Sequence, residues 1–386
     1  MSQRIHSKSK NTKAKKTDQK TVNLALQGGG SHGAFAWGVL DKLLEDGRID
    51  IEGICATSAG TMNACALVSG LQSGDLKKDP QKARDKARES LHDFWWHIHQ
   101  NGQSYNPVRR MPWEKLLGWN MDHSPAHFFF DSMTRLFSPY QFNPFDINPL
   151  RDVLEKTVDF EKIKACESVK LFISATHVQS GKVRVFDSSD VTIDVAMASA
   201  CLPFLFKAVS IKGEDFWDGG YMGNPALYPL FYKTKSRDLV IVHVNPIERS
   251  ETPTTSHDIM NRINEISFNS SLLNEMRAIA FVKKLKEHDM LKDEHKDDFK
   301  DMLVHSVRAD HALEDLSVAS KFDSDWEFLQ MLRDKGRDVM GTWLDKNFKY
   351  LGEKDTVDLN QEFLNSNTNL FEDEHGEHVH HHHKHA

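Results

Sequence analysis

The sequence has few cysteines and no long hydrophobic run, and each lack excludes a class of protein. Its 386 residues include four cysteines, which stand far apart and show no Cys-x-x-Cys spacing. We therefore expect buried free thiols in a reducing compartment rather than a zinc site. No apolar run reaches the length that is needed to cross a bilayer. The formal net charge of -7 argues against general nucleic-acid binding.

Both ends of the chain are polar. Residues 1–20 are basic, and no apolar stretch of signal-peptide length follows them, so we expect a disordered tail and no secretory signal. A weak electrostatic tether to anionic lipid or to another partner is the alternative for this tail. Residues 353–386 form a polar tail with a histidine run, which indicates either metal binding or an affinity-tag remnant. We expect a cytoplasmic protein that contacts membranes peripherally.

The order of hydrophobic patterns predicts an α/β fold. Residues 21–26 and 51–56 are short apolar runs typical of buried strands. Each is followed by a helical pattern, over residues 35–44 and 59–71 respectively. A strand–helix–strand–helix order implies a parallel sheet covered by helices.

Changes in composition divide the rest of the chain. We expect a main domain over residues 21–250, with an aromatic, proline-broken, cap-like insertion at 94–145. The rings of that insertion either fill the space between helices or line an acyl-chain groove and touch a membrane. Residues 251–352 predict a helical extension, because apolar residues recur at helical spacing. Further strands of the main domain are expected at residues 171–176, 183–186 and 239–245.

A glycine-rich turn follows the first predicted strand. Gly28, Gly30 and Gly33 have the Gly-x-Gly-x-x-Gly spacing of a dinucleotide-binding loop. That use requires an acidic residue at the end of the second strand, but the sequence there is Cys-Ala-Thr-Ser-Ala-Gly. No Gly-Lys-Ser/Thr follows the glycines, so a P-loop is excluded as well.

A serine stands at the turn after the second strand. Gly-x-Ser-x-Gly is typical of a nucleophile elbow, and Ala56-Thr57-Ser58-Ala59-Gly60 matches it with a small alanine in place of the first glycine. Ser58 would lie at the N-terminus of the next helix, where partial positive charge favours an alkoxide. The alternative is a serine that only caps that helix.

An acyl-transfer serine also needs an oxyanion hole and a base. The backbone amides of Gly28, Gly29 and Gly30 suit the first role, because no Cβ blocks access to them. Asp218, which two glycines follow, is a candidate for the second role. On its own an Asp-Gly-Gly sequence is more typical of a solvated turn.

Together these motifs resemble the patatin-like phospholipase family. The resemblance covers about residues 22–245. Two positions depart from the family pattern: His32 stands where Arg or Lys is usual, and Ala56 stands where glycine is usual. The motifs that match, in the family's order, are Gly28–Gly33, Thr57–Gly60, the Ala-Ser-x-x-x-Pro block Ala198–Pro203, and Asp218–Gly220.

The resemblance implies a three-layer α/β sandwich with a mostly parallel sheet, and makes residues 21–250 the catalytic domain. It implies a serine–aspartate dyad, in which Ser58 forms an acyl-enzyme and Asp218 is the base. The expected activity is hydrolysis of carboxylic esters in phospholipids or related lipids, of phospholipase A or lysophospholipase type, with no cofactor or metal. The oxyanion hole would be Gly28, Gly29 and Gly30, and the supporting motif residues would be His32, Gly33, Gly60, Gly219 and Gly220.

Two alternatives stay open. Ser58, Asp218 and His243 occur in the chain order of a Ser-Asp-His triad esterase, although His243 lies inside a predicted strand. His177, near another strand end, is a second candidate for the histidine. The other alternative is a non-catalytic member that binds lipid or a protein through its C-terminal helices.

Overall fold

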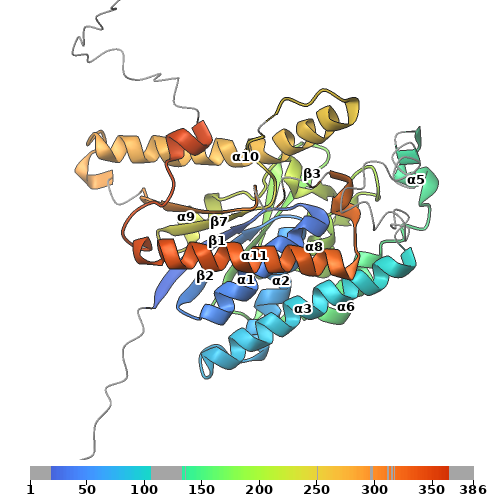
Figure 1. Ribbon diagram of the computed structural model, residues 1–386, viewed down its shortest axis with the longest axis horizontal. Coiled ribbons are helices and arrows are strands. Elements are labelled where there is room, and N and C mark those ends of the chain that lie inside the picture. Colours follow the sequence, from blue (N-terminus) through green and yellow to red (C-terminus); the bar gives the residue numbers. More distant parts are fainter. Residues whose placement is uncertain are drawn as a thin grey trace, which may run out of the picture.

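The structure is a computed structural model, and Figure 1 shows its arrangement. It describes residues 19–105, 133–134, 136–249, 251–295, 299–310, 313, 316 and 318–364.

A central eight-stranded sheet organises the described part of the chain. Its order is β5-β6-β3-β2-β1-β7-β8, and β4 also pairs with β3. β3, β2, β1, β7 and β8 run parallel, while β4 and β6 are antiparallel to β3, and β5 to β6. The strands are β1 (Lys20–Leu26), β2 (Ile49–Ala56), β3 (Lys170–His177), β4 (Val183–Asp187), β5 (Val209–Ile211), β6 (Glu214–Asp218), β7 (Asp238–His243) and β8 (Leu303–Arg308).

Helices cover both faces of this sheet. In Figure 1, α1, α2, α3 and α11 lie below the sheet and α10 lies above it. The α-helices are α1 (Gly33–Asp46), α2 (Ala59–Ser73), α3 (Pro80–Tyr105), α5 (Pro139–Phe142), α6 (Pro149–Thr157), α7 (Phe160–Lys164), α8 (Ile193–Ser199), α9 (Tyr228–Lys233), α10 (Ser256–Glu287) and α11 (Trp326–Asn347). Shorter helices are η1 (Gly30–His32), η3 (Gly219–Tyr221), η4 (Asp293–His295), η5 (Val318–Phe322), η6 (Phe348–Tyr350) and η7 (Asn360–Leu364).

The strands are apolar on both sides because both faces of the sheet are covered. Along β1, Leu24 and Leu26 point into the core shared with α1, α2 and α11, whereas Ala25 points into the second core beneath α10. This alternation follows from the two-residue period of a strand. The expected three-layer sandwich with a mostly parallel sheet is confirmed.

The predicted strands and helices of the main domain are present. The extension contains the helices α10 and α11, but it is not purely helical, because β8 lies between them and pairs with β7. Of the predicted aromatic insertion, residues 94–105 complete α3, with Phe94 and Trp95 buried in the core. Residues 106–132 of that insertion lie outside the described residues, as do most of the two tails.

The prediction that the cysteines are buried free thiols is confirmed for Cys55, Cys65, Cys166 and Cys201. Within the described ranges, no helix combines the length and the apolar character that crossing a membrane requires.

Candidate active site

Ser58 occupies a strained turn between β2 and α2. Its φ of 53° and ψ of -123° are unusual for a residue with a side chain. The turn is tight because α2 starts against β1: a Cβ at Gly60 would collide with the carbonyl oxygen of Leu26. Ser58 makes no capping hydrogen bond to α2, so the structure does not support the helix-cap alternative.

Neighbouring hydroxyls hold this turn in place. The Ser58 amide donates to Ser199 Oγ at 3.0 Å, and that hydroxyl donates to the carbonyl oxygen of Ser174 in β3 at 2.8 Å. Thr57 Oγ1 donates to the carbonyl oxygen of Gly223 at 2.6 Å. Ser199 belongs to the Ala-Ser-x-x-x-Pro block, and its contacts explain why a serine suits that position.

Asp218 ends β6, opposite Ala175 of β3, and is fully buried. Its Oδ1 accepts a hydrogen bond from the Gly220 amide at 2.7 Å, while its Oδ2 is buried without a hydrogen-bond partner in the described part of the chain. Burial raises the pKa of Asp218 to about 6, against the opposing effects of the Gly220 amide, the Ser58 hydroxyl and the Lys321 ammonium. The Ser58 and Asp218 side chains are therefore neighbours, and Oδ2 is the atom free to accept a proton.

The glycine turn lies directly against Ser58. A Cβ at Gly28 would be 2.6 Å from the Cβ of Ser58. The Gly28 carbonyl accepts from Asn245 Nδ2 at 2.7 Å, and its amide donates to Asn224 Oδ1 at 2.7 Å. The amide expected to face an oxyanion is thus already engaged at Gly28. The amides of Gly29 and Gly30 donate to no acceptor among the described residues.

His32 ends η1 and is buried against η5. Its Nε2 is 2.7 Å from Ser320 Oγ in η5. Burial, together with the charges of Lys321 and Arg249, holds the pKa of His32 well below its usual value, so the ring is neutral. A Cβ at the adjacent Gly33 would lie 2.6 Å from the Cβ of Ala59 in α2.

The two glycines after Asp218 allow equally close contacts. A Cβ at Gly219 would collide with the Ser174 carbonyl oxygen, and one at Gly220 would collide with the ring of Phe268 in α10. The extension therefore packs directly against the Asp-Gly-Gly motif.

Sequence motifs did not identify three of the residues that shape the turn. Asn224 Oδ1 accepts from the Gly28 amide, Asn245 Nδ2 donates to the Gly28 carbonyl oxygen, and Lys321 donates to Asn245 Oδ1 at 2.9 Å. The only sequence feature that could have indicated a site role for Asn245 is its position after the buried strand β7. No sequence feature indicates such a role for Lys321, which belongs to the extension.

Comparison with known proteins identifies the family of this chain. The model of the patatin-like phospholipase family matches residues 24–231, which include the glycine turn, the elbow and the Asp-Gly-Gly motif. The chain belongs to the patatin-like phospholipase family. A search of the curated proteins found no match.

A search of the solved structures matches two proteins at low sequence identity and low TM-score. VipD from Legionella pneumophila is 13% identical, with a TM-score of 0.39, and the match covers 89% of this chain and 72% of that one. The heterodimeric ExoU–SpcU complex from the type III secretion system of Pseudomonas aeruginosa contains a chain that is 15% identical, with a TM-score of 0.34. That match covers 86% of this chain and 53% of the other, so this chain spans about half of its length.

The two histidines of the triad alternative make their contacts with other residues. His243 is fully buried, with its Nε2 3.1 Å from Ser306 Oγ in β8 and its ring stacked on Phe363. Burial and the charge of Arg308 lower the pKa of His243 to about 3. His177 Nδ1 is 2.8 Å from Ser180 Oγ in a turn. No contact joins either histidine to Ser58 or Asp218 in the described part of the chain.

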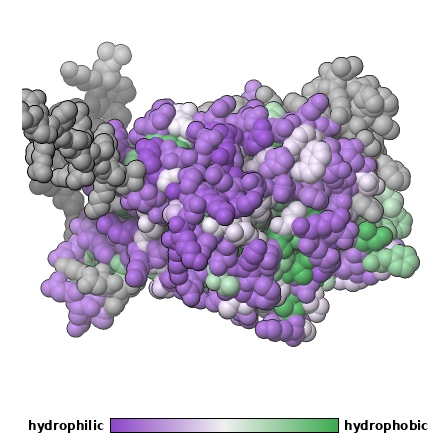
Figure 2. Space-filling model, turned by 90° about the horizontal axis from the view of Figure 1, so that it is seen from below, coloured by the Kyte–Doolittle hydropathy of each residue, from purple (hydrophilic) through white to green (hydrophobic). Residues whose placement is uncertain are grey.

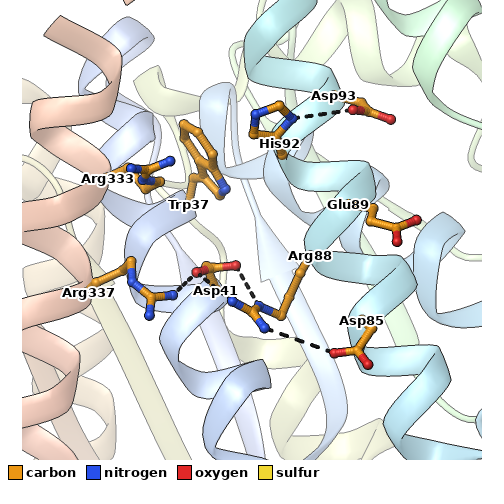
Figure 3. Close-up of a pocket in the computed structure, with 9 residues that line it drawn as sticks. All are labelled: Trp37, Asp41, Asp85, Arg88, Glu89, His92, Asp93, Arg333 and Arg337. Atoms are coloured by element: carbon orange, nitrogen blue, oxygen red, sulfur yellow. Dashed lines mark hydrogen bonds and ion pairs between the residues drawn. The ribbon is translucent and has the colours of Figure 1, made fainter. Parts of the chain in front are cut away.

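A pocket lies between α1, α3 and α11 (Figure 3). There Asp41 on α1 is bound by Arg88 from α3, with Nε 2.8 Å from Oδ1, and by Arg337 from α11. Arg337 also contacts both carboxylate oxygens of Glu45 at 2.9 Å. These paired charges fasten two helices to α1, so we interpret this pocket as structural.

Proposed function

We propose that this protein hydrolyses carboxylic esters of phospholipids or related lipids through an acyl-enzyme on Ser58, with Asp218 as the base. The proposal refines the lipid ester hydrolase activity that membership of the family supports. The observation that carries it is the proximity of two groups: a serine on a strained turn, and a buried carboxylate whose Oδ2 has no hydrogen-bond partner among the described residues.

In the first step, the Ser58 hydroxyl proton passes to Asp218 Oδ2 and Oγ attacks the ester carbonyl carbon. The amides of Gly29 and Gly30 stabilise the resulting oxyanion. When the tetrahedral intermediate collapses, the C–O bond to the leaving alcohol breaks and Asp218 returns the proton to that alcohol. Asp218 then takes a proton from water, whose oxygen attacks the acyl carbon. The bond between that carbon and Ser58 Oγ breaks, Asp218 returns the proton to Oγ, and the fatty acid leaves.

Contact with a lipid surface forms part of the proposal. Four apolar side chains on the first half of α10 are 41–54% exposed: Ile259, Met260, Ile263 and Ile266. This helix reaches the site, because the ring of Phe268 lies 5.7 Å from that of Tyr221, three residues after Asp218. In Figure 1, α5 and the first turns of α10 lie toward the right-hand end. Figure 2 views the molecule from below, the side away from α10, and shows a few hydrophobic residues toward the right-hand end of that face. An exposed apolar surface beside a lipid-hydrolysing site suits peripheral membrane binding.

Hydrolysis of p-nitrophenyl esters with short to long acyl chains tests the proposal. Wild type should be active and should label with a fluorophosphonate probe, whereas Ser58→Ala should be inactive and unlabelled. Asp218→Asn should be folded and inactive, while His243→Ala should remain active if it is folded. An inactive, folded His243→Ala would favour the triad. A wild type that neither hydrolyses nor labels would favour a non-catalytic binding protein.

A further inference from the structure

The short helix η5 joins the C-terminal extension to the glycine turn. A Cβ at Gly30, whose φ is +57°, would lie 2.5 Å from the carbonyl oxygen of Lys321. One residue earlier, Ser320 Oγ is 2.7 Å from His32 Nε2. Residues nearly three hundred positions apart in sequence thus form one packed unit beside Ser58.

Within this unit, hydrogen bonds run from Lys321 to the turn. Its ammonium donates to Asn245 Oδ1 at 2.9 Å, and Asn245 Nδ2 donates to the Gly28 carbonyl at 2.7 Å. An ammonium group can only donate, so it must meet the oxygen of the asparagine amide. Lys321 therefore fixes which way the Asn245 amide points, and so directs its NH₂ group at the turn.

Lys321 also supplies positive charge where the turn itself has none. His32 is neutral, as argued above, and Lys321 is the cation whose charge lowers the pKa of Asp218. The ammonium lies 5.5 Å from the centre of the Phe268 ring, in partly apolar surroundings. In such surroundings a charge acts over a longer range than it does in water.

We propose that Lys321 is a positioning residue for ester hydrolysis: through Asn245 it holds the glycine turn in the geometry that receives the oxyanion, and its charge favours the anionic intermediate. This inference rests on the proposed function. Lys321 acts on the transition state and not on the bound substrate, so its loss should lower kcat and leave KM nearly unchanged. Because it acts through another residue, we expect a fall in kcat of about 10- to 100-fold, less than the loss of a direct oxyanion donor causes.

The test compares Lys321→Met and Lys321→Arg with a change at a partly buried lysine elsewhere in the chain. Lys300 is a suitable control, because its ammonium donates to backbone carbonyls of Leu230 and Thr234, away from the turn. With a soluble short-chain ester, Lys321→Met should lose kcat, Lys321→Arg should regain part of it, and Lys300→Met should keep wild-type kcat per folded molecule. Circular dichroism and thermal unfolding verify that each variant is folded.

A second variant tests the route through Asn245. Asn245→Leu should also lower kcat. The fold-loss of kcat in the double variant Lys321→Met/Asn245→Leu should be much smaller than the product of the fold-losses of the two single variants. Independent, multiplicative losses would overturn the role through Asn245. If Asn245→Leu proves poorly folded, Lys321→Arg and the pH profile still test the inference.

The pH profile separates a charge effect from a merely structural one. Removing the positive charge should raise the pKa of Asp218, so the acid limb of kcat/KM should move to higher pH in Lys321→Met and not in Lys321→Arg. Burial lowers the pKa of Lys321 itself to about 8, so its ammonium is charged over the acid limb. His32 is neutral there, and burial keeps Cys201 and Tyr221 neutral with pKa values of about 12. Glu265 lies in ion pairs with Arg249 and Arg262.

Three results would overturn the inference. If folded Lys321→Met keeps wild-type kcat, the inference fails and the proposed function stands. If kcat falls but neither the acid limb moves nor Lys321→Arg restores activity, the role of Lys321 is only structural. If wild type itself neither hydrolyses esters nor reacts with a fluorophosphonate, the proposed function fails and the inference fails with it.

Discussion

The Cα of Gly28 faces Ser58 so closely that an added Cβ would lie 2.6 Å from the Cβ of Ser58. The same relationship recurs between Gly33 and Ala59, again at 2.6 Å. The glycine turn and the elbow are therefore packed as one unit at the carboxyl ends of β1 and β2. The glycines serve here to bring a backbone against a serine, which the phosphate-loop interpretation of the same spacing would not require.

This packing predicts that Gly28→Ala removes activity. The new methyl group must push Ser58 or the turn aside, so we expect kcat/KM to fall by at least about 100-fold, because small displacements at a reacting centre are costly. The free energy of unfolding should drop by about 1–3 kcal/mol, as is usual for overpacking. Ester hydrolysis and urea unfolding measure the two effects.

Gly341→Ala on α11 is the matched control. A Cβ there would meet only the flexible end of Lys42, at 3.7 Å. Because alanine favours helix, this variant should be as stable as wild type or more stable by up to about 1 kcal/mol, with unchanged activity. Equal activity in the Gly28 and Gly341 variants would contradict the proposed role of the turn.

The raised pKa of Asp218 predicts an acid limb in the rate profile. The base must be ionised to accept the Ser58 proton, and its pKa is about 6. We therefore expect kcat/KM to fall below about pH 6, approaching tenfold per pH unit at lower pH. A profile measured between pH 4.5 and 9 tests this, with a stability check at each pH. A rate that is constant down to pH 4.5 would argue against Asp218 as the base.

The same shift predicts that Asp218 costs stability at neutral pH. Its folded pKa of about 6 exceeds the ordinary value of 3.8, so the folded state binds the proton more tightly than the unfolded state does. Its contribution to stability is complete below about pH 4 and is lost as the pH rises through about 6. Asp218→Asn should therefore be more stable than wild type by about 1–3 kcal/mol at pH 8, although inactive. Thermal melts at pH 8 and pH 5 should show this advantage shrinking at the lower pH.

His243 should behave in the opposite way. Its folded pKa of about 3 lies below the ordinary value of 6.5, so the stability that its neutral ring provides is present above pH 6.5 and is lost as the pH falls toward 3. Replacing it with a residue that does not titrate, as in His243→Gln, should reduce the loss of stability between pH 6.5 and pH 4. Urea unfolding at these two pH values measures the difference, and an unchanged pH dependence would contradict a buried neutral histidine.

The sequence predicted the first two strand–helix units well because local chemistry controls them. Small residues at the ends of β1 and β2 indicate tight turns, and the apolar runs before them indicate buried strands. β8 was missed because its centre is polar: His305 and Ser306 interrupt the apolar run. The structure can bury His305 because its Nε2 pairs with Asp238 Oδ1 at 2.9 Å, a partner that the local sequence does not reveal. Lys321 was missed for the same reason, since only the folded chain brings it to the turn.

The exposed apolar side chains of α10 give a last prediction, about lipid surfaces. Replacing Ile263 and Ile266, which are 54% and 53% exposed, with glutamate places charge where the proposed membrane contact lies. Hydrolysis of phospholipid in vesicles should fall by about tenfold or more, because each change removes apolar contact and adds the cost of burying a carboxylate. Hydrolysis of a soluble short-chain ester should not change, because neither side chain belongs to the proposed dyad.

Phe281→Glu is the matched control: Phe281 is equally exposed on α10 but lies about 22 Å further along the helix axis than Ile266. Equal losses in all three variants would show that α10 does not bind lipid through its first half, whereas a loss confined to Ile263 and Ile266 would place the membrane beside Asp218.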